Sequence, residues 1–275
     1  MEEFRGSSAA LQSVRFAGGH FIVFLKLTAT WAVIASAVTF AYLLVSHPAG
    51  SGSSLATELG AMDGHKSGPM LTIVNFVVFA LGNVFVGMAW ARFALLNEVP
   101  RFPLRITRET WSYLWRWLAI STLSVLGGLP IFVFLVLARR GDVIPSLLLT
   151  FLLIAVAIGI MIAINARLCI ALAAAAVGRP VSFRQVWSDT VGTTASLSGG
   201  LVLSYVVCAI GLIVVMIGAF ILVRSGMADV AYPAKEVLSN LFSFGIAALS
   251  AGYSAAAYNY FFPGVAANDI ASTFE

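Results

Sequence analysis

Arginine and tryptophan side chains gather in two polar connections of an otherwise apolar chain. Residues 91–117 read ARFALLNEVPRFPLRITRETWSYLWRW and hold five of the sixteen Lys and Arg residues. A weaker copy, ARLCIALAAAAVGRPVSFRQVWSDTVG, occupies residues 166–192. Guanidinium groups bind phosphate and carboxylate strongly, and tryptophan is enriched at membrane–water boundaries. The chemistry that these residues favour is contact with anionic lipid headgroups or with a partner protein.

The candidate surface combines the basic residues of the two connections with one tryptophan from each. Its members are Arg92, Arg101, Arg105, Arg108, Trp111, Arg116, Arg167, Arg179, Arg184 and Trp187. The plainer alternative is a pair of short amphipathic helices that only anchor the bundle at the membrane surface. One would include residues 105–117, and the other would begin at Ser182, where Gln185 has capping-box spacing.

Arg92 and Arg167 occupy matching places at the ends of two apolar runs. Arginines there commonly extend their head groups to the membrane surface. They can also pair with Glu98, Glu109 or Asp189, or close over a phosphate. The sequence leaves these alternatives open.

Three asparagines, Asn75, Asn83 and Asn165, interrupt the apolar runs. Asn75 and Asn83 are eight residues apart and so lie on roughly one face of a helix. Interhelical hydrogen bonds explain such residues, and a polar path for a solute is the alternative. Lys26 is the only charged residue within the predicted spans. The lack of an acidic residue there argues against an ion-coupled transporter.

No motif for catalysis, cofactor binding or metal binding is found in the sequence. The three histidines are scattered, and Cys169 and Cys208 lie in or beside apolar runs, as buried small residues do. No serine elbow and no phosphate-binding loop are present. We therefore expect no enzyme activity, no cofactor and no metal site.

The elements that carry these residues are long apolar runs. The chain has 60% apolar and only 10% charged residues, far from the soluble average. About twenty helical residues cross a ~30 Å hydrocarbon core. The pattern predicts an all-α, polytopic transmembrane helical bundle of about six spans, with a possible parallel internal repeat. The predicted segments are an N-terminal arm at 1–20, spans at about 21–45, 70–91, 118–138, 146–166, 197–223 and 238–262, and a C-terminal tail at 263–275.

The distribution of Lys and Arg predicts the orientation of the bundle. Eleven lie on the side of the termini and the two connections, and five lie on the other side: Lys66, Arg139, Arg140, Arg224 and Lys235. By the positive-inside rule, both termini are expected in the cytoplasm. Arg139 and Arg140 are the discordant pair. Because the positive charge sits in short connections and not in a tail or block, nucleic-acid binding is excluded.

The two connections also predict an internal repeat. Arg92 and Arg167 are 75 residues apart, Trp111 and Trp187 are 76 apart, and glycine pairs that begin at 127 and 199 are 72 apart. Such a small drift is typical of a duplicated unit, here spans 2–3 and 4–5 in parallel orientation. Chance similarity between two connections of one membrane protein is the alternative.

The second connection carries a family resemblance. An Ala-Arg pair that ends an apolar run is followed by Gly178-Arg179-Pro180, Ser182 and Trp187 before a glycine-rich span. This pattern resembles bacterial six-helix membrane proteins of unknown function, which look like the membrane domain attached to some glycerophosphodiester phosphodiesterases. The resemblance covers about residues 20–262 and implies an inner-membrane bundle. The soluble phosphodiesterase domain of such fusions is absent, so no catalytic residue carries over.

The leading hypothesis is a non-enzymatic structural, assembly or lipid-interacting accessory protein of the bacterial inner membrane. Its expected partners are membrane lipids, including anionic headgroups, and other membrane proteins. The alternative is a passive channel or transporter for a small or amphipathic solute. That alternative depends on the repeat, on the asparagines, and on Pro130 beside a glycine pair.

Overall fold

The computed structural model describes residues 4–46, 69–100, 106–140, 147–179 and 181–263. These ranges are mostly helical and contain no strand. Six of the helices are long and apolar enough to cross a membrane, which confirms the predicted all-α bundle with six spans. They are α2 (Phe21–Ser46), α4 (Pro69–Leu96), α5 (Arg108–Arg140), α6 (Leu147–Leu168), α9 (Thr194–Arg224) and α10 (Ala228–Phe261).

Two boundaries differ from the sequence-based prediction. Residues 108–117 belong to α5 and do not form a separate surface helix, because no glycine or proline interrupts the chain before the span. Helix α10 begins ten residues before the predicted start at 238, with Pro233 inside it. Glu236, which falls between two predicted spans, therefore lies in a helix. Residues 47–68, between the first two predicted spans, and residues 264–275 of the predicted tail lie outside the described residues.

Helix α1 (Gly6–Gly19) occupies most of the predicted N-terminal arm and packs against α9 and α10. Its buried face consists of small residues, which let helices approach closely. The Gly6 amide donates to Ser196 Oγ at 2.7 Å, and Ser13 Oγ donates to the Leu249 carbonyl at 2.8 Å. A side chain at Gly6 would overlap the Ser196 carbonyl. The first helix is thus built into the bundle.

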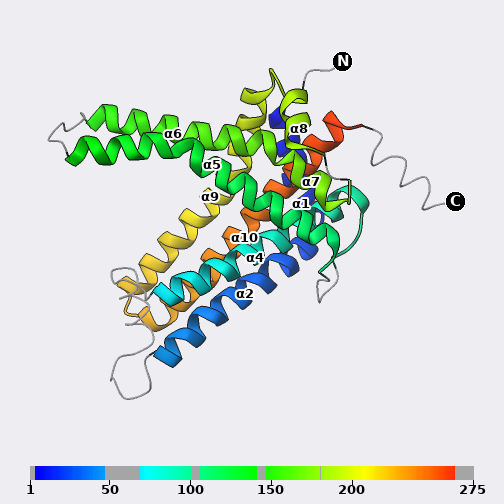
Figure 1. Cartoon of the computed structure of the whole chain (residues 1–275). Coiled ribbons are helices and arrows are strands. Elements are labelled where there is room, and N and C mark those ends of the chain that lie inside the picture. Colours follow the sequence, from blue (N-terminus) through cyan, green and yellow to red (C-terminus); the bar gives the residue numbers. More distant parts are fainter. Residues whose placement is uncertain (1–3, 47–68, 101–105, 141–146, 180, 264–275) are drawn as a thin grey trace.

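Helix α7 (Ile170–Ala176) lies at the centre of one end of the molecule, and all seven of its residues are buried. It packs against α4, α5, α6, α10 and α8 (Phe183–Asp189). Alanine makes up most of α7, so its neighbours can come close from every side. We call this end the head. It comprises residues 4–20, 88–100, 106–117, 166–179, 181–200 and 249–263, and α1, α7 and α8 gather there in Figure 1.

Away from the head, the long helices separate into two groups (Figure 1). Helices α2, α4 and α10 run together with α9 beside them, whereas α5 and α6 leave the head as an antiparallel pair in another direction. The α5 glycine pair lies against α6: a Cβ atom at Gly127 would be 2.6 Å from Ile164 Cδ1, and one at Gly128 would be 3.0 Å from Met161 Sδ. The glycine pair therefore lets α6 pack closely against α5.

An aromatic layer holds α2, α4 and α10 together. Trp31 of α2 stacks on Phe85 of α4 with ring centroids 5.4 Å apart, and Phe79 of α4 contacts Phe244 of α10 at 5.3 Å. Gly82 provides room for this layer, because a side chain there would overlap the Phe244 ring. These three helices therefore form the packed centre of the membrane-spanning part.

Candidate functional site

The two arginine-rich connections have the same local design. After α4 the chain turns at Asn97 with φ 55°, and after α7 it turns at Gly178 with φ 75°. Positive φ is a common way to end a helix. The following helices then begin at hydroxyl residues: Thr107 Oγ1 accepts from the Thr110 amide at 3.4 Å, and Ser182 Oγ accepts from the Gln185 amide at 3.2 Å. The predicted Ser182 cap is confirmed.

The connections lie side by side in the head. A Cβ atom at Gly178, in the second connection, would be 3.6 Å from Glu109 Cγ in the first turn of α5. Arg116 of α5 also reaches across: its Nη1 donates to the Val181 carbonyl at 2.5 Å, and its guanidinium lies 5.5 Å from the Phe183 ring centroid. The two connections therefore form one surface.

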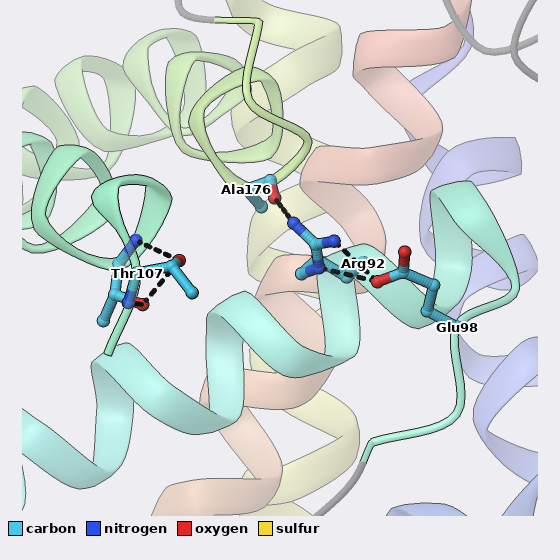
Figure 2. A network of polar contacts seen from close by, with 5 residues as sticks. Arg92, Glu98, Thr107 and Ala176 are labelled. Carbon is cyan, nitrogen blue, oxygen red and sulfur yellow. Dashed lines mark hydrogen bonds and ion pairs between the residues drawn. The ribbon is translucent and has the colours of Figure 1, made fainter. Parts of the chain in front are cut away.

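Arg92 fastens the end of α4 to the end of α7. Its Nε and Nη2 donate to Glu98 Oε2 at 2.9 and 2.6 Å, and its Nη1 donates to the Ala176 carbonyl at 2.8 Å. Figure 2 shows Arg92 between these two partners. The carbonyls at the end of a helix lack partners within the helix, so a cation there is favourable. Of the alternatives for Arg92, pairing with Glu98 is the one observed.

Arg167 is buried, with 8% of its surface exposed, and fastens α8 to the end of α6. Its Nε donates to Thr190 Oγ1 at 3.0 Å, and its Nη2 donates to the Trp187 carbonyl. The guanidinium carbon lies 3.7 Å from the Trp187 ring centroid, a cation–π contact. Arg92, Arg116 and Arg167 thus bind other parts of the head and hold its helices and connections together.

The other described basic residues of the candidate surface, Arg108, Arg179 and Arg184, are exposed. Arg108 precedes Trp111 on α5, and Arg184 precedes Trp187 on α8, each by three residues. Residues at i and i+3 share a helix face. Trp111 is 64% exposed and Trp187 is 44% exposed. Each connection therefore presents an Arg-x-x-Trp pair outward, a pattern that the residue-by-residue sequence reasoning missed. Arg101 and Arg105 lie outside the described residues.

These contacts do not test the predicted internal repeat, which stays a prediction. The helix ends and caps of the two connections correspond, as described above. The matched arginines differ: Arg92 binds Glu98 and Ala176, whereas Arg167 binds Thr190 and Trp187. Helix α8 ends before α9 begins, whereas the first connection runs directly into α5.

The three asparagines of the proposed polar path lie in different surroundings. Asn75 Oδ1 accepts from Thr39 Oγ1 of α2 at 3.4 Å. Asn83 Nδ2 donates to the Phe79 carbonyl of its own helix at 2.7 Å. Asn165 is half-buried on α6. Bonding within and between helices accounts for Asn75 and Asn83, and the polar path stays a prediction.

A set of polar residues that the sequence reasoning missed joins α2 and α10 near Asn75. Asn240 Nδ2 donates to Ser36 Oγ at 3.0 Å and to Glu236 Oε1 at 3.4 Å. Glu236 was missed because its surroundings read as a loop; the four-residue spacing of Glu236 and Asn240 is the helical signal that was available. We call Ser36, Thr39, Asn75, Glu236 and Asn240 the polar cluster.

Among the described residues, no group of three or more His, Cys, Asp or Glu side chains is placed to hold a metal ion. Cys169 and Cys208 are free thiols and buried. His20 packs its ring against Phe16 and Phe93 at the end of α1.

Protein-family models, curated proteins and solved structures contain no match to this chain. The resemblance to the membrane domain of glycerophosphodiester phosphodiesterases therefore stays a prediction. The chemistry of the head and of the polar cluster is therefore the basis for any functional proposal.

Proposed function

We propose that this chain is a non-enzymatic, multi-pass accessory protein of the bacterial inner membrane whose head binds anionic lipid headgroups on the cytoplasmic side. Six spans support a multi-pass membrane protein. The excess of basic residues around the termini and connections supports a cytoplasmic head. The same surface would also suit an acidic face of another membrane protein, which fits a role in assembly.

The observation that carries this proposal is the pair of outward Arg-x-x-Trp faces. An arginine at the membrane surface attracts anionic lipids, and a neighbouring tryptophan prefers the depth of the headgroups. The arginines that point inward support these faces, because Arg92, Arg116 and Arg167 tie the two connections to α7, α8 and each other. A surface held in place loses less entropy when it binds.

The proposal is tested by lipid titration of the purified full chain in detergent. Phosphatidylglycerol should bind more tightly than phosphatidylcholine, and added salt should weaken its binding because headgroup attraction is screened. An Arg108→Gln/Arg184→Gln variant should bind phosphatidylglycerol about 30-fold more weakly, since each basic residue near an anionic surface contributes about 1 kcal/mol.

The matched control is Arg224→Gln. Arg224 is also exposed and lies near an aromatic ring, that of Phe220, but it sits at the end of α9 away from the head. Its replacement should leave lipid affinity unchanged. Equal binding of the two lipids, or an equal loss in the control, would contradict the proposal.

The alternative, a passive channel or transporter, is weaker. Asn83 bonds to its own helix and Asn75 to the neighbouring α2, so helix packing is enough to explain both.

A further inference from the structure

We propose that the polar cluster is a binding site for a small monovalent cation, independent of the lipid-binding head. The site lies between α2, α4 and α10, towards the end of these helices that is farthest from the head. The proposal goes beyond headgroup binding, because it concerns the membrane-spanning part of the protein.

Hydrogen bonds link polar side chains of three helices in the cluster. Ser36 of α2 accepts from Asn240 of α10 at 3.0 Å, and Thr39 of α2 donates to Asn75 of α4 at 3.4 Å. Ser36 and Thr39 are three residues apart on α2, so they share a helix face. Both are buried, with 2% and 7% of their surfaces exposed. Two hydroxyl, two amide and one carboxylate side chain are therefore connected by three hydrogen bonds and by the spacing of Ser36 and Thr39.

Glu236 gives this site its charge. It lies near the start of the α10 segment Pro233–Phe261, which is apolar and long enough to span a membrane, and it is half-buried. In the described part of the chain its hydrogen-bond partner is the neutral amide of Asn240, and no Arg or Lys forms an ion pair with it. A half-buried carboxylate with no basic partner can take a cation as its counter-ion.

The kind of ligand follows from the donor atoms. Hydroxyl, amide and carboxylate oxygens bind hard cations, whereas transition metals prefer imidazole and thiolate. Calcium sites generally use several carboxylates, and magnesium requires near-ideal octahedral geometry and keeps several waters. One carboxylate among neutral oxygens balances a single positive charge, so a monovalent cation is the matching ligand.

The aromatic layer of Trp31, Phe79, Phe85 and Phe244 lies on the head side of the cluster. Along α10, Phe244 is one helical turn closer to the head than Asn240, and along α4, Phe79 is one turn closer than Asn75. The layer is closely packed around Gly82. A cation would therefore enter from the end opposite the head.

A purely structural role is the competing interpretation, because interhelical hydrogen bonds stabilise membrane bundles by themselves. The two interpretations differ over the charge of Glu236. A structural role requires hydrogen bonding, which glutamine retains, whereas a cation site requires the carboxylate. Glu236→Gln therefore separates them.

The experiment measures thermal unfolding of the purified full chain in detergent at constant ionic strength. Sodium, potassium or lithium chloride replaces choline chloride, whose quaternary ammonium is much larger than these three ions. At saturation we expect at least one small cation to raise Tm by about 5 °C. Glu236→Gln should abolish this rise. Glu98→Gln, which removes a carboxylate from the head, should retain it.

Retention of radioactive sodium or rubidium by the immobilised protein provides a second measurement. If Glu236→Gln does not fold, Ser36→Ala and Asn75→Ala should each lower cation retention at least severalfold while Asn83→Ala does not. The same Tm in every chloride salt, or a rise that persists in Glu236→Gln, would overturn the proposal. A larger rise with magnesium or calcium would refute the monovalent assignment.

Discussion

Helices α9 and α10 follow each other in the chain and pack together, yet their surroundings are opposite. In α10, 61% of the most apolar stretch is buried inside the protein, against 6% in α9. Helix α10 contacts α1, α2, α4, α7 and α9. Helix α9 packs along one face, where Gly211 lies against Phe242 of α10, and presents aliphatic side chains outward on the other, among them Val206, Ile210, Val214 and Ile217.

The two helices also differ in the polar residues that they carry. Helix α10 carries Asn240 and Tyr253, which bond to other helices: Asn240 Nδ2 donates to Ser36 Oγ of α2, and Tyr253 Oη donates to the Leu197 carbonyl of α9 at 2.8 Å. Glu236 of α10 accepts from Asn240 of the same helix. The outward face of α9 consists of residues that lipid tails can solvate. The side chains of a membrane helix therefore indicate what surrounds it. Polar side chains require protein partners, whereas aliphatic side chains can face lipid.

The sharpest test of this comparison uses two adjacent glycines of α9. A side chain at Gly200 would meet the Gly6 backbone and would lie 2.7 Å from Tyr253 Cε2, whereas a side chain at Gly199 has open space. Gly200→Val should destabilise the protein by about 3 kcal/mol or more through overpacking. Gly199→Val should change stability by less than about 0.5 kcal/mol. Thermal unfolding in detergent measures both, and equal effects would show that α1 does not pack against α9.

A second test compares inward and outward arginines of the head. Arg167→Ala removes a buried guanidinium and leaves Thr190 and the Trp187 carbonyl without that partner, so a loss of about 2–3 kcal/mol is expected. Arg184→Ala removes an exposed side chain and should cost less than about 0.5 kcal/mol. Denaturant unfolding of both variants checks the difference. Equal losses of stability would contradict the distinction between arginines that hold the head together and arginines exposed on its surface.

The smallest expected effect concerns the bond between Asn240 and Ser36. A double-mutant cycle with Asn240→Ala and Ser36→Ala should give a coupling energy of about 0.6 kcal/mol, typical of hydrogen bonds between membrane helices. The unfolding free energies of the two single variants and the double variant provide the value. A coupling near zero would mean that this bond adds nothing to the packing of α2 against α10.

Much of the fold could be predicted from the sequence because membrane spans are strong local signals. The six apolar runs correspond to six long helices, and Ser182 caps α8 as its spacing with Gln185 indicates. The glycine pair of α5 lets α6 pack closely against it. Each of these predictions depends on residues close together in the chain.

The remaining features depend on partners far away in the chain. Arg92 binds a carbonyl 84 residues away, so its neighbours in sequence do not distinguish it from the exposed Arg108. The start of α10 was misplaced because Pro233 and charged residues suggested a loop, although a proline near the start of a helix disturbs few of its hydrogen bonds. This error hid Glu236, and with it the polar cluster.

The position of α1 against α9 and α10 determines when the head can be completed during synthesis. During synthesis α1 emerges before its partners, because Ser196 follows Gly6 by 190 residues and Leu249 follows Ser13 by 236. The small-residue face of α1 therefore stays unpaired until α9 and α10 have been made. The head closes only after α10 is synthesised, and a chain that stops before α10 would expose this face to quality-control proteases and chaperones.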